Sequence, residues 1–124
     1  MKIGYIKING RKYPACLSSR VIMNIKEYTG KNFTDGINEI LKADNFEGLF
    51  WLMSQMLDAG MRYSRLIGDE VTEPPKEEDL LDLIGIDDYG KLTDTLTAVV
   101  VDTAEPEVVL EGDEKNAKTT KPKA

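Results

Sequence analysis

Residues 3–16 of this chain read IGYIKINGRKYPAC, and they predict a β-hairpin at the start of the fold. Apolar and polar side chains alternate over residues 3–8, as in a strand with one buried face. Asn9-Gly10 comes next, and both residues tolerate the positive φ angles that a type I′ turn requires. Pro14 has no N–H to donate, so the return strand must lie at a sheet edge or end early. A lone hairpin is marginal in water, so it must pack on the rest of the chain.

The next part of the chain has the apolar periodicity of helices. Ser18 or Ser19 can cap a first helix that runs to about residue 29, where Gly30 can end it in the left-handed conformation. Thr34 or Asp35 is expected to cap a short second helix. The sequence therefore predicts two consecutive helices directly after the hairpin.

The longest predicted helix covers about residues 45–67. Asp44-Asn-Phe-Glu47 is typical of a capping box before it. Its apolar residues cover more than one narrow stripe, so this helix is either central to the fold or exposed to a partner. Gly60 inside it costs about 1 kcal/mol relative to alanine, and the usual reason for such a glycine is close packing.

Two further helices are expected after a stop at Pro74-Pro75. The fourth begins with Glu77-Glu78-Asp79, where the positive end of the helix dipole favours carboxylates, and Gly85 ends it. Asp87 or Asp88 opens a fifth helix of about a dozen residues. Leu92, Leu96 and Val99 form its core stripe, and the β-branched run at residues 99–101 leaves a break into strand open there.

These elements predict an α+β fold that is mostly α, with the N-terminal hairpin packed on a bundle of about five helices. We expect residues 1–102 to form one domain, with a body at 1–68 and an acidic helical part at 69–102. Residues 103–124 lack helical or β periodicity, and we expect a charged, largely disordered tail there. Within this tail, Val108-Val109-Leu110 is apolar enough to dock on the domain.

Charge is distributed in three blocks along the chain. Residues 1–68 carry a net charge of +4, residues 69–114 of −14 and residues 115–124 of +4, which gives −6 for the whole chain. Such asymmetry indicates a body, an acidic second part and a tail that have different partners. The alternative interpretation is that the acidic surface only keeps the protein in solution.

Composition excludes several classes of function. The chain has 124 residues and no apolar run of 18, so we expect no membrane span. It has no histidine, which removes the commonest general base and excludes Ser-His and Cys-His nucleophile pairs. Its single cysteine cannot form an internal disulfide, which is typical of a reducing cytoplasm. We therefore expect a cytoplasmic, non-catalytic protein without cofactor or metal.

Three weaker candidates for chemistry have structural explanations. Glu77, Glu78 and Asp79 occupy consecutive helical positions and cannot converge on one metal ion. Cys16, beside Ala15 and Leu17, is typical of core filling rather than of a reactive thiol. Nucleic-acid binding is disfavoured because the −14 block would repel phosphates.

The third helix carries the most suggestive group of side chains. Methionine is flexible and polarisable, which suits a surface that repacks against a partner, although core filling explains each methionine singly. We expect the helix to present an apolar interaction face with basic residues at its C-terminal end. The candidate partner-binding residues are Phe50, Met53, Met56, Met61, Arg62 and Arg65.

The order of elements resembles a known family. An Ile-Asn-Gly-Arg-Lys-Tyr hairpin at residues 8–13 leads into a helix that ends in Ile-Lys-Glu-Tyr-Thr-Gly at residues 25–30, and a mostly helical body with a charged end comes after it. In this respect the chain resembles the tail assembly chaperones of long-tailed phages and prophages of Gram-positive bacteria. The resemblance covers about residues 3–67 and is weaker in the acidic helices beyond.

The resemblance implies a small non-catalytic protein that is made in the infected cell and is absent from the mature virion. It implies binding to the tape-measure protein, whose apolar helices are kept soluble while tail-tube subunits polymerise around it. The tail-tube protein is the second implied partner, and self-association is compatible with this role. The family has no catalytic residues to carry over.

Two alternatives stay open at this point. One is a structural tail-completion or connector subunit, which would share size and charge but be present in purified particles. The other is an acidic regulatory protein-binding module, which would need the carboxylates of residues 69–114 to line one exposed surface.

Overall fold

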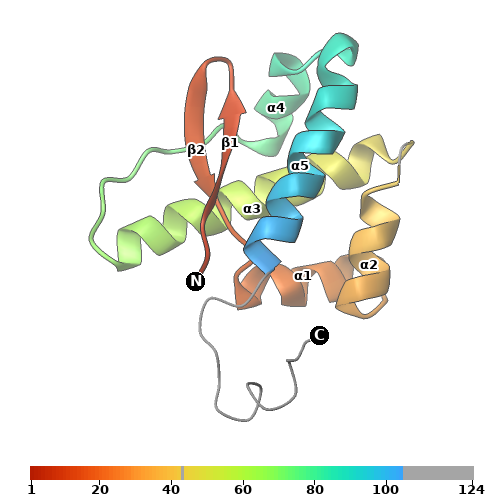
Figure 1. Ribbon diagram of the computed structural model, residues 1–124, viewed down its shortest axis with the longest axis horizontal. Helices are drawn as coiled ribbons and strands as arrows, with labels where there is room; N and C mark the ends of the chain where they lie inside the picture. Colours follow the sequence, from red (N-terminus) through yellow and green to blue (C-terminus); the bar gives the residue numbers. More distant parts are fainter. Residues whose placement is uncertain (43, 105–124) are drawn as a thin grey trace.

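The computed structural model of this protein describes residues 1–42 and 44–104 (Figure 1). Within these residues it confirms the α+β, mostly α fold class, with an N-terminal two-stranded hairpin followed by five α-helices. A short 3₁₀ helix precedes the last of them. The elements are β1 (Gly4–Ile8), β2 (Arg11–Ala15), α1 (Ser19–Thr29), α2 (Phe33–Ile40), α3 (Phe46–Leu66), α4 (Glu77–Leu83), η1 (Ile86–Asp88) and α5 (Tyr89–Ala104).

The hairpin has the turn and the alternation that the sequence predicts. Asn9 and Gly10 have φ angles of 55° and 84°, the positive values of a type I′ turn. Ile6 is paired with Tyr13 across the antiparallel ladder, and both side chains are buried, whereas Lys7 is exposed. The hairpin therefore has one apolar face to bury.

That face packs on α3 at very short range. A Cβ atom built on Gly60 would lie 2.1 Å from the carbonyl oxygen of Pro14, so only glycine fits where the end of β2 crosses the helix. Four residues earlier on α3, the carbonyl oxygen of Met56 accepts a hydrogen bond of 3.3 Å from the backbone N–H of Cys16. Figure 1 shows the hairpin crossing the middle of α3. The close packing predicted for Gly60 is confirmed.

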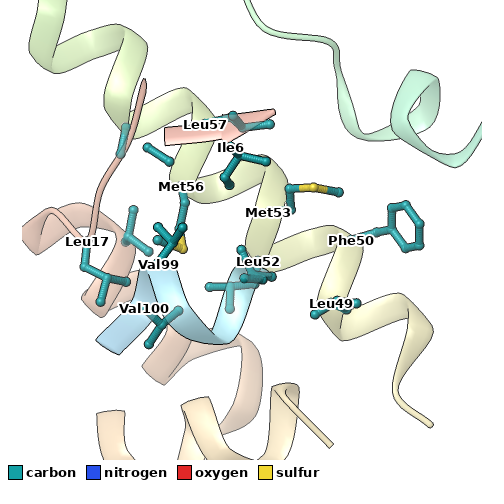
Figure 2. Close-up of a cluster of buried hydrophobic side chains, with 14 of the residues drawn as sticks. Ile6, Leu17, Leu49, Phe50, Leu52, Met53, Met56, Leu57, Val99 and Val100 are labelled. Atoms are coloured by element: carbon teal, nitrogen blue, oxygen red, sulfur yellow. The ribbon is translucent and has the colours of Figure 1, made fainter. Parts of the chain in front are cut away.

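The acidic helical part packs on the body. Leu80 of α4 and Leu96 of α5 are fully buried. The last two turns of α5 lie against β1, since a Cβ atom on Gly4 would lie 2.9 Å from Val99 Cγ1 and 3.3 Å from Thr103 Cγ2. The buried apolar side chains of the hairpin and all five helices form one continuous core, part of which Figure 2 shows.

Two predicted helix N-caps are wrong, by two or three residues for α2 and by one residue for α3. The N-cap of α2 is Asn32, whose Oδ1 accepts a 2.9 Å hydrogen bond from the Asp35 N–H, and Thr34 and Asp35 lie inside the first turn. The N-cap of α3 is Asn45, whose Oδ1 accepts a 3.0 Å bond from the Gly48 N–H.

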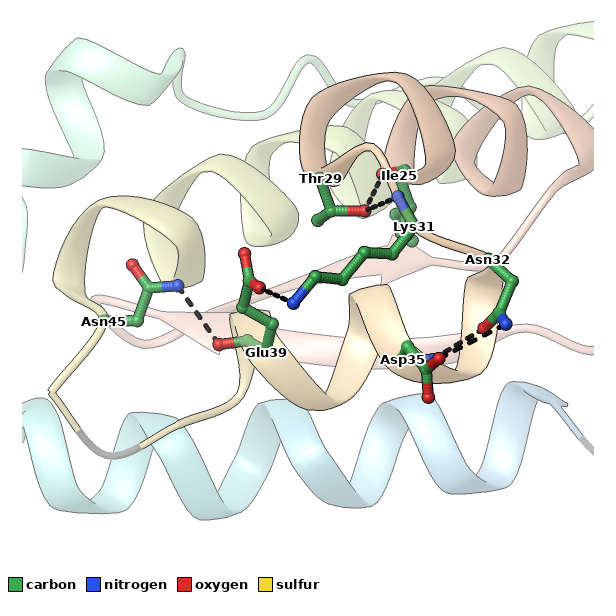
Figure 3. Close-up of polar contacts among 7 residues, drawn as sticks. All are labelled: Ile25, Thr29, Lys31, Asn32, Asp35, Glu39 and Asn45. Atoms are coloured by element: carbon green, nitrogen blue, oxygen red, sulfur yellow. Dashed lines mark hydrogen bonds and ion pairs between the residues drawn. The ribbon is translucent and has the colours of Figure 1, made fainter.

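The Asn45 side chain explains why Asp44 does not start the predicted capping box. Its Nδ2 also donates to the carbonyl oxygen of Glu39 at 3.2 Å, so one amide joins the end of α2 to the start of α3 (Figure 3). A carboxylate can accept such bonds but cannot donate one.

The end of the described chain also differs from the prediction. Residues 99–101 are helical rather than extended, and α5 continues to Ala104, so the predicted tail begins at least two residues too early. Val99, Val100 and Thr103 are buried, and this burial outweighs the weak helix propensity of β-branched residues. Helix α4 ends at Leu83, and Gly85 instead precedes η1. The tail expected over residues 105–124 lies outside the described residues.

Among the helices in the described ranges, none combines the length and apolarity that a bilayer span requires.

Candidate partner-binding surface

Three of the six candidate residues lie in the core. Phe50 is 4% exposed, and Met53 and Met56 are fully buried (Figure 2). The expectation that they form an exposed face is therefore wrong. Helix α3 is the centre of the fold: the hairpin, α1, α2 and α4 all pack on it, so its wide apolar stripe is covered from several sides.

The other three candidates lie on the last two turns of α3, where they separate onto two neighbouring faces. Met61 is partly buried and lines a hollow of about 550 Å³ beneath the linker that contains Pro74 and Pro75. Arg62 and Arg65 are exposed and line a groove between the end of α3 and the start of α1.

We call this second feature the α3-tip groove. It has a volume of about 450 Å³, and it combines an apolar floor with a polar rim. Ala59 is buried at its base, whereas Leu66 is 84% exposed at its outer end. Its lining residues are Met1, Ser18, Ser19, Arg20, Ala59, Arg62, Tyr63, Arg65 and Leu66.

The groove has a positive rim. Among the described residues that line it, Arg20, Arg62 and Arg65 are basic and none is acidic. Arg62 also forms an exposed ion pair with Asp58 one turn earlier, with 2.7 Å between Nε and Oδ2. That contact uses one of the five N–H donors of a guanidinium. The rim therefore favours an apolar ligand that carries carboxylates.

The groove forms at the end of α3, beyond the elements that pack on the middle of this helix. Helix α1 begins at Ser19 after the N-cap Ser18, whose Oγ accepts a hydrogen bond of 3.3 Å from the Val21 N–H. This start places the Ser18–Arg20 side of the chain beside Ala59 and Tyr63. Beyond Tyr63, α3 continues as an exposed turn, and Ile67 after it is 51% exposed.

Sequence reasoning identified the two arginines and missed Tyr63, Leu66 and Ile67. The available signal was the apolar Leu66-Ile67 pair directly beside Arg65 at the end of the helix. A pair of large apolar residues at a helix end, just before a glycine and an acidic linker, has no core to enter.

Other large apolar side chains are exposed on α4 and η1. Leu81, Leu83 and Ile86 are 56%, 44% and 82% exposed. Exposed carboxylates lie beside them in the sequence, including those of Asp82 and Asp87.

In the described part of the chain, no group of three or more His, Cys, Asp or Glu residues is placed to hold a metal ion.

Cys16 belongs to the core. Its side chain is fully buried, and burial raises the pKa of its thiol. The core-filling interpretation of this residue is confirmed.

No protein-family model, curated protein or solved structure that was compared matches this chain.

Proposed function

We propose that this protein is a non-catalytic tail assembly chaperone of a long-tailed phage. In this role it binds apolar helical segments of the tape-measure protein and keeps them dispersed until tail-tube subunits enclose them. It acts in the cytoplasm of the infected bacterium and stays out of the mature virion.

The observation that carries the proposal is the α3-tip groove. It places Leu66, 84% exposed, beside the floor at Ala59 and the guanidinium groups of Arg62 and Arg65. An amphipathic helix can lay its apolar stripe on such a floor while its acidic side chains face the arginines. The hairpin and the helix ending at Gly30, on which the resemblance to these chaperones rests, support the same role.

The proposed mechanism is shielding rather than chemistry. The end of α3 covers part of the apolar stripe of a tape-measure helix, and the acidic surface of α4 and η1 repels neighbouring complexes. Because the covered area is small, each contact is weak and reversible, which suits a chaperone that tube subunits must displace.

The DNA downstream of the gene gives the first test. A slippery heptamer near the stop codon, an overlapping frame and then a very long helix-rich gene are expected. A gene that stands alone, or beside DNA-binding regulators, would instead favour the acidic regulatory module.

Co-expression with the product of that long gene gives the second test. Leu66→Asp should lower the soluble yield of the partner, because a carboxylate then stands at the outer end of the groove. Ile86→Asp is the matched control, since Ile86 is nearly as exposed, at 82%, and lies in η1. Loss of solubility with Ile86→Asp alone would move the partner to α4 and η1 and contradict the proposal.

A further inference from the structure

We propose that residues 105–114 of the same chain bind the α3-tip groove. This segment reads EPEVVLEGDE and combines an apolar triplet, Val108-Val109-Leu110, with five carboxylates and no basic residue. The groove offers the complementary chemistry, an apolar floor at Ala59 and Tyr63 with three arginines on its rim.

Helix α5 ends beside the start of β1, on the chain that leads to the groove. Thr103 Cγ2 would lie 3.3 Å from a Cβ atom on Gly4, so the last turn of α5 contacts the start of β1. Met1, three residues before Gly4, lines the groove. In Figure 1 the end of α5 lies near the marked N-terminus, in agreement with this contact.

The reach of the chain is sufficient. The three peptide steps from Gly4 to Met1 span at most about 11 Å, and the six from Ala104 to Leu110 at most about 22 Å. The chain that follows α5 is therefore long enough for its apolar triplet to pass the start of β1 and meet the Met1 side of the groove.

Charge selects this segment over the rest of the tail. Residues 105–114 carry a charge of −5, whereas residues 115–124 carry +4 and would be repelled by Arg20, Arg62 and Arg65. Exposed ion pairs are individually weak. A tethered segment, however, meets its site at an effective concentration on the order of 1 mM, so weak contacts are enough to occupy the groove.

The consequence is competition. While residues 105–114 fill the groove, an acidic amphipathic helix must displace them before it binds, which lowers the apparent affinity for such partners. This consequence rests on the proposed function, whereas the contact between segment and groove does not.

A spin label tests the contact in the full chain. Val109→Cys carries a nitroxide, and the one native thiol, Cys16, is buried and stays unlabelled. We expect strong loss of the amide NMR signals of residues 18–20 and 62–66, with the signals of residues 80–88 unchanged. Thr120→Cys, labelled in the same way, is the matched control and should cause much weaker loss at the groove.

Two further sets of variants test whether the contact depends on charge. Arg62→Glu combined with Arg65→Glu should restore the groove signals, and adding Glu107→Lys and Glu111→Lys should remove them again. Equal broadening from positions 109 and 120, or broadening that persists after charge reversal, overturns the proposal. Broadening only in a mixture of separately labelled copies would assign the groove to a second copy and also overturn it. These outcomes concern the chain alone, so they leave the co-expression test of the chaperone role independent.

Discussion

Replacing Gly60 with alanine should push the hairpin away from α3 and lower the stability of the protein. The added methyl carbon would lie 2.1 Å from the oxygen and 2.4 Å from the carbon of the Pro14 carbonyl, and 2.8 Å from the nitrogen of Ala15. All three are backbone atoms, so no side chain can rotate away. The strand would have to retreat by about 0.9 Å to restore a separation of 3.0 Å.

The magnitude is set by three contributions of opposing sign. Overpacking of this kind costs about 1–3 kcal/mol. A retreat of the strand also breaks the Cys16–Met56 backbone hydrogen bond, already 3.3 Å long, which costs about 1 kcal/mol. Against this, alanine is favoured over glycine within a helix by about 1 kcal/mol. The free energy of unfolding should therefore fall by about 1–3 kcal/mol, towards the upper end because backbone must move.

Urea and thermal unfolding measure this difference, and Gly90→Ala is the matched control. Gly90 lies in α5 with no atom within 4 Å of the position of an added Cβ, so the same substitution should stabilise the protein by up to about 1 kcal/mol. The Gly60→Ala variant should melt roughly 5–20 °C lower than the parent. If both variants are as stable as the parent or more so, the hairpin does not pack on α3 as described.

Three further predictions concern the caps, the core and one ion pair. Asn32→Ala removes the N-cap of α2 and should cost about 1 kcal/mol in urea unfolding, whereas Asn38→Ala, at an exposed position inside the helix, should cost nothing measurable. Met53→Glu places a carboxylate in the core and should abolish the native circular dichroism signal, so a folded variant would contradict the burial of this residue. The hydrogen bond from Lys31 lowers the pKa of the Glu39 carboxyl; its contribution to stability is present above the unfolded pKa and is lost as pH falls through the folded one. An NMR titration should give Glu39 a higher midpoint in Lys31→Met than in the parent, and equal midpoints would refute the pairing (Figure 3).

Local signals in the sequence were sufficient for most of the fold. The Asn9-Gly10 turn, the end of α1 at Gly30 and the acidic first turn of α4 each depend on a residue's own conformational or electrostatic preference. Gly60 was also informative, because a glycine inside an otherwise apolar helix has few explanations other than a close neighbour. These features need no knowledge of distant contacts.

The errors arose where distant contacts decide the outcome. Asn45 caps α3 in place of Asp44 because its amide can also donate to the carbonyl oxygen of Glu39, a contact between two helices. Residues 99–101 form helix because the fold buries two of these valines, Val99 and Val100, and β1 packs on Val99. Periodicity shows that a stripe is apolar, but it does not show how many neighbours cover it.

The same limit explains the division of the candidate site. The 21 residues of α3 make a helix of about 32 Å. The hairpin crosses it near Gly60, and α1, α2 and α4 pack on other parts of it. Met53 and Met56 lie in the part of the helix that these neighbours bury, whereas Arg62, Arg65 and Leu66 lie towards its exposed end and line the groove. Position along the axis therefore decides which residues of this helix remain available to a partner.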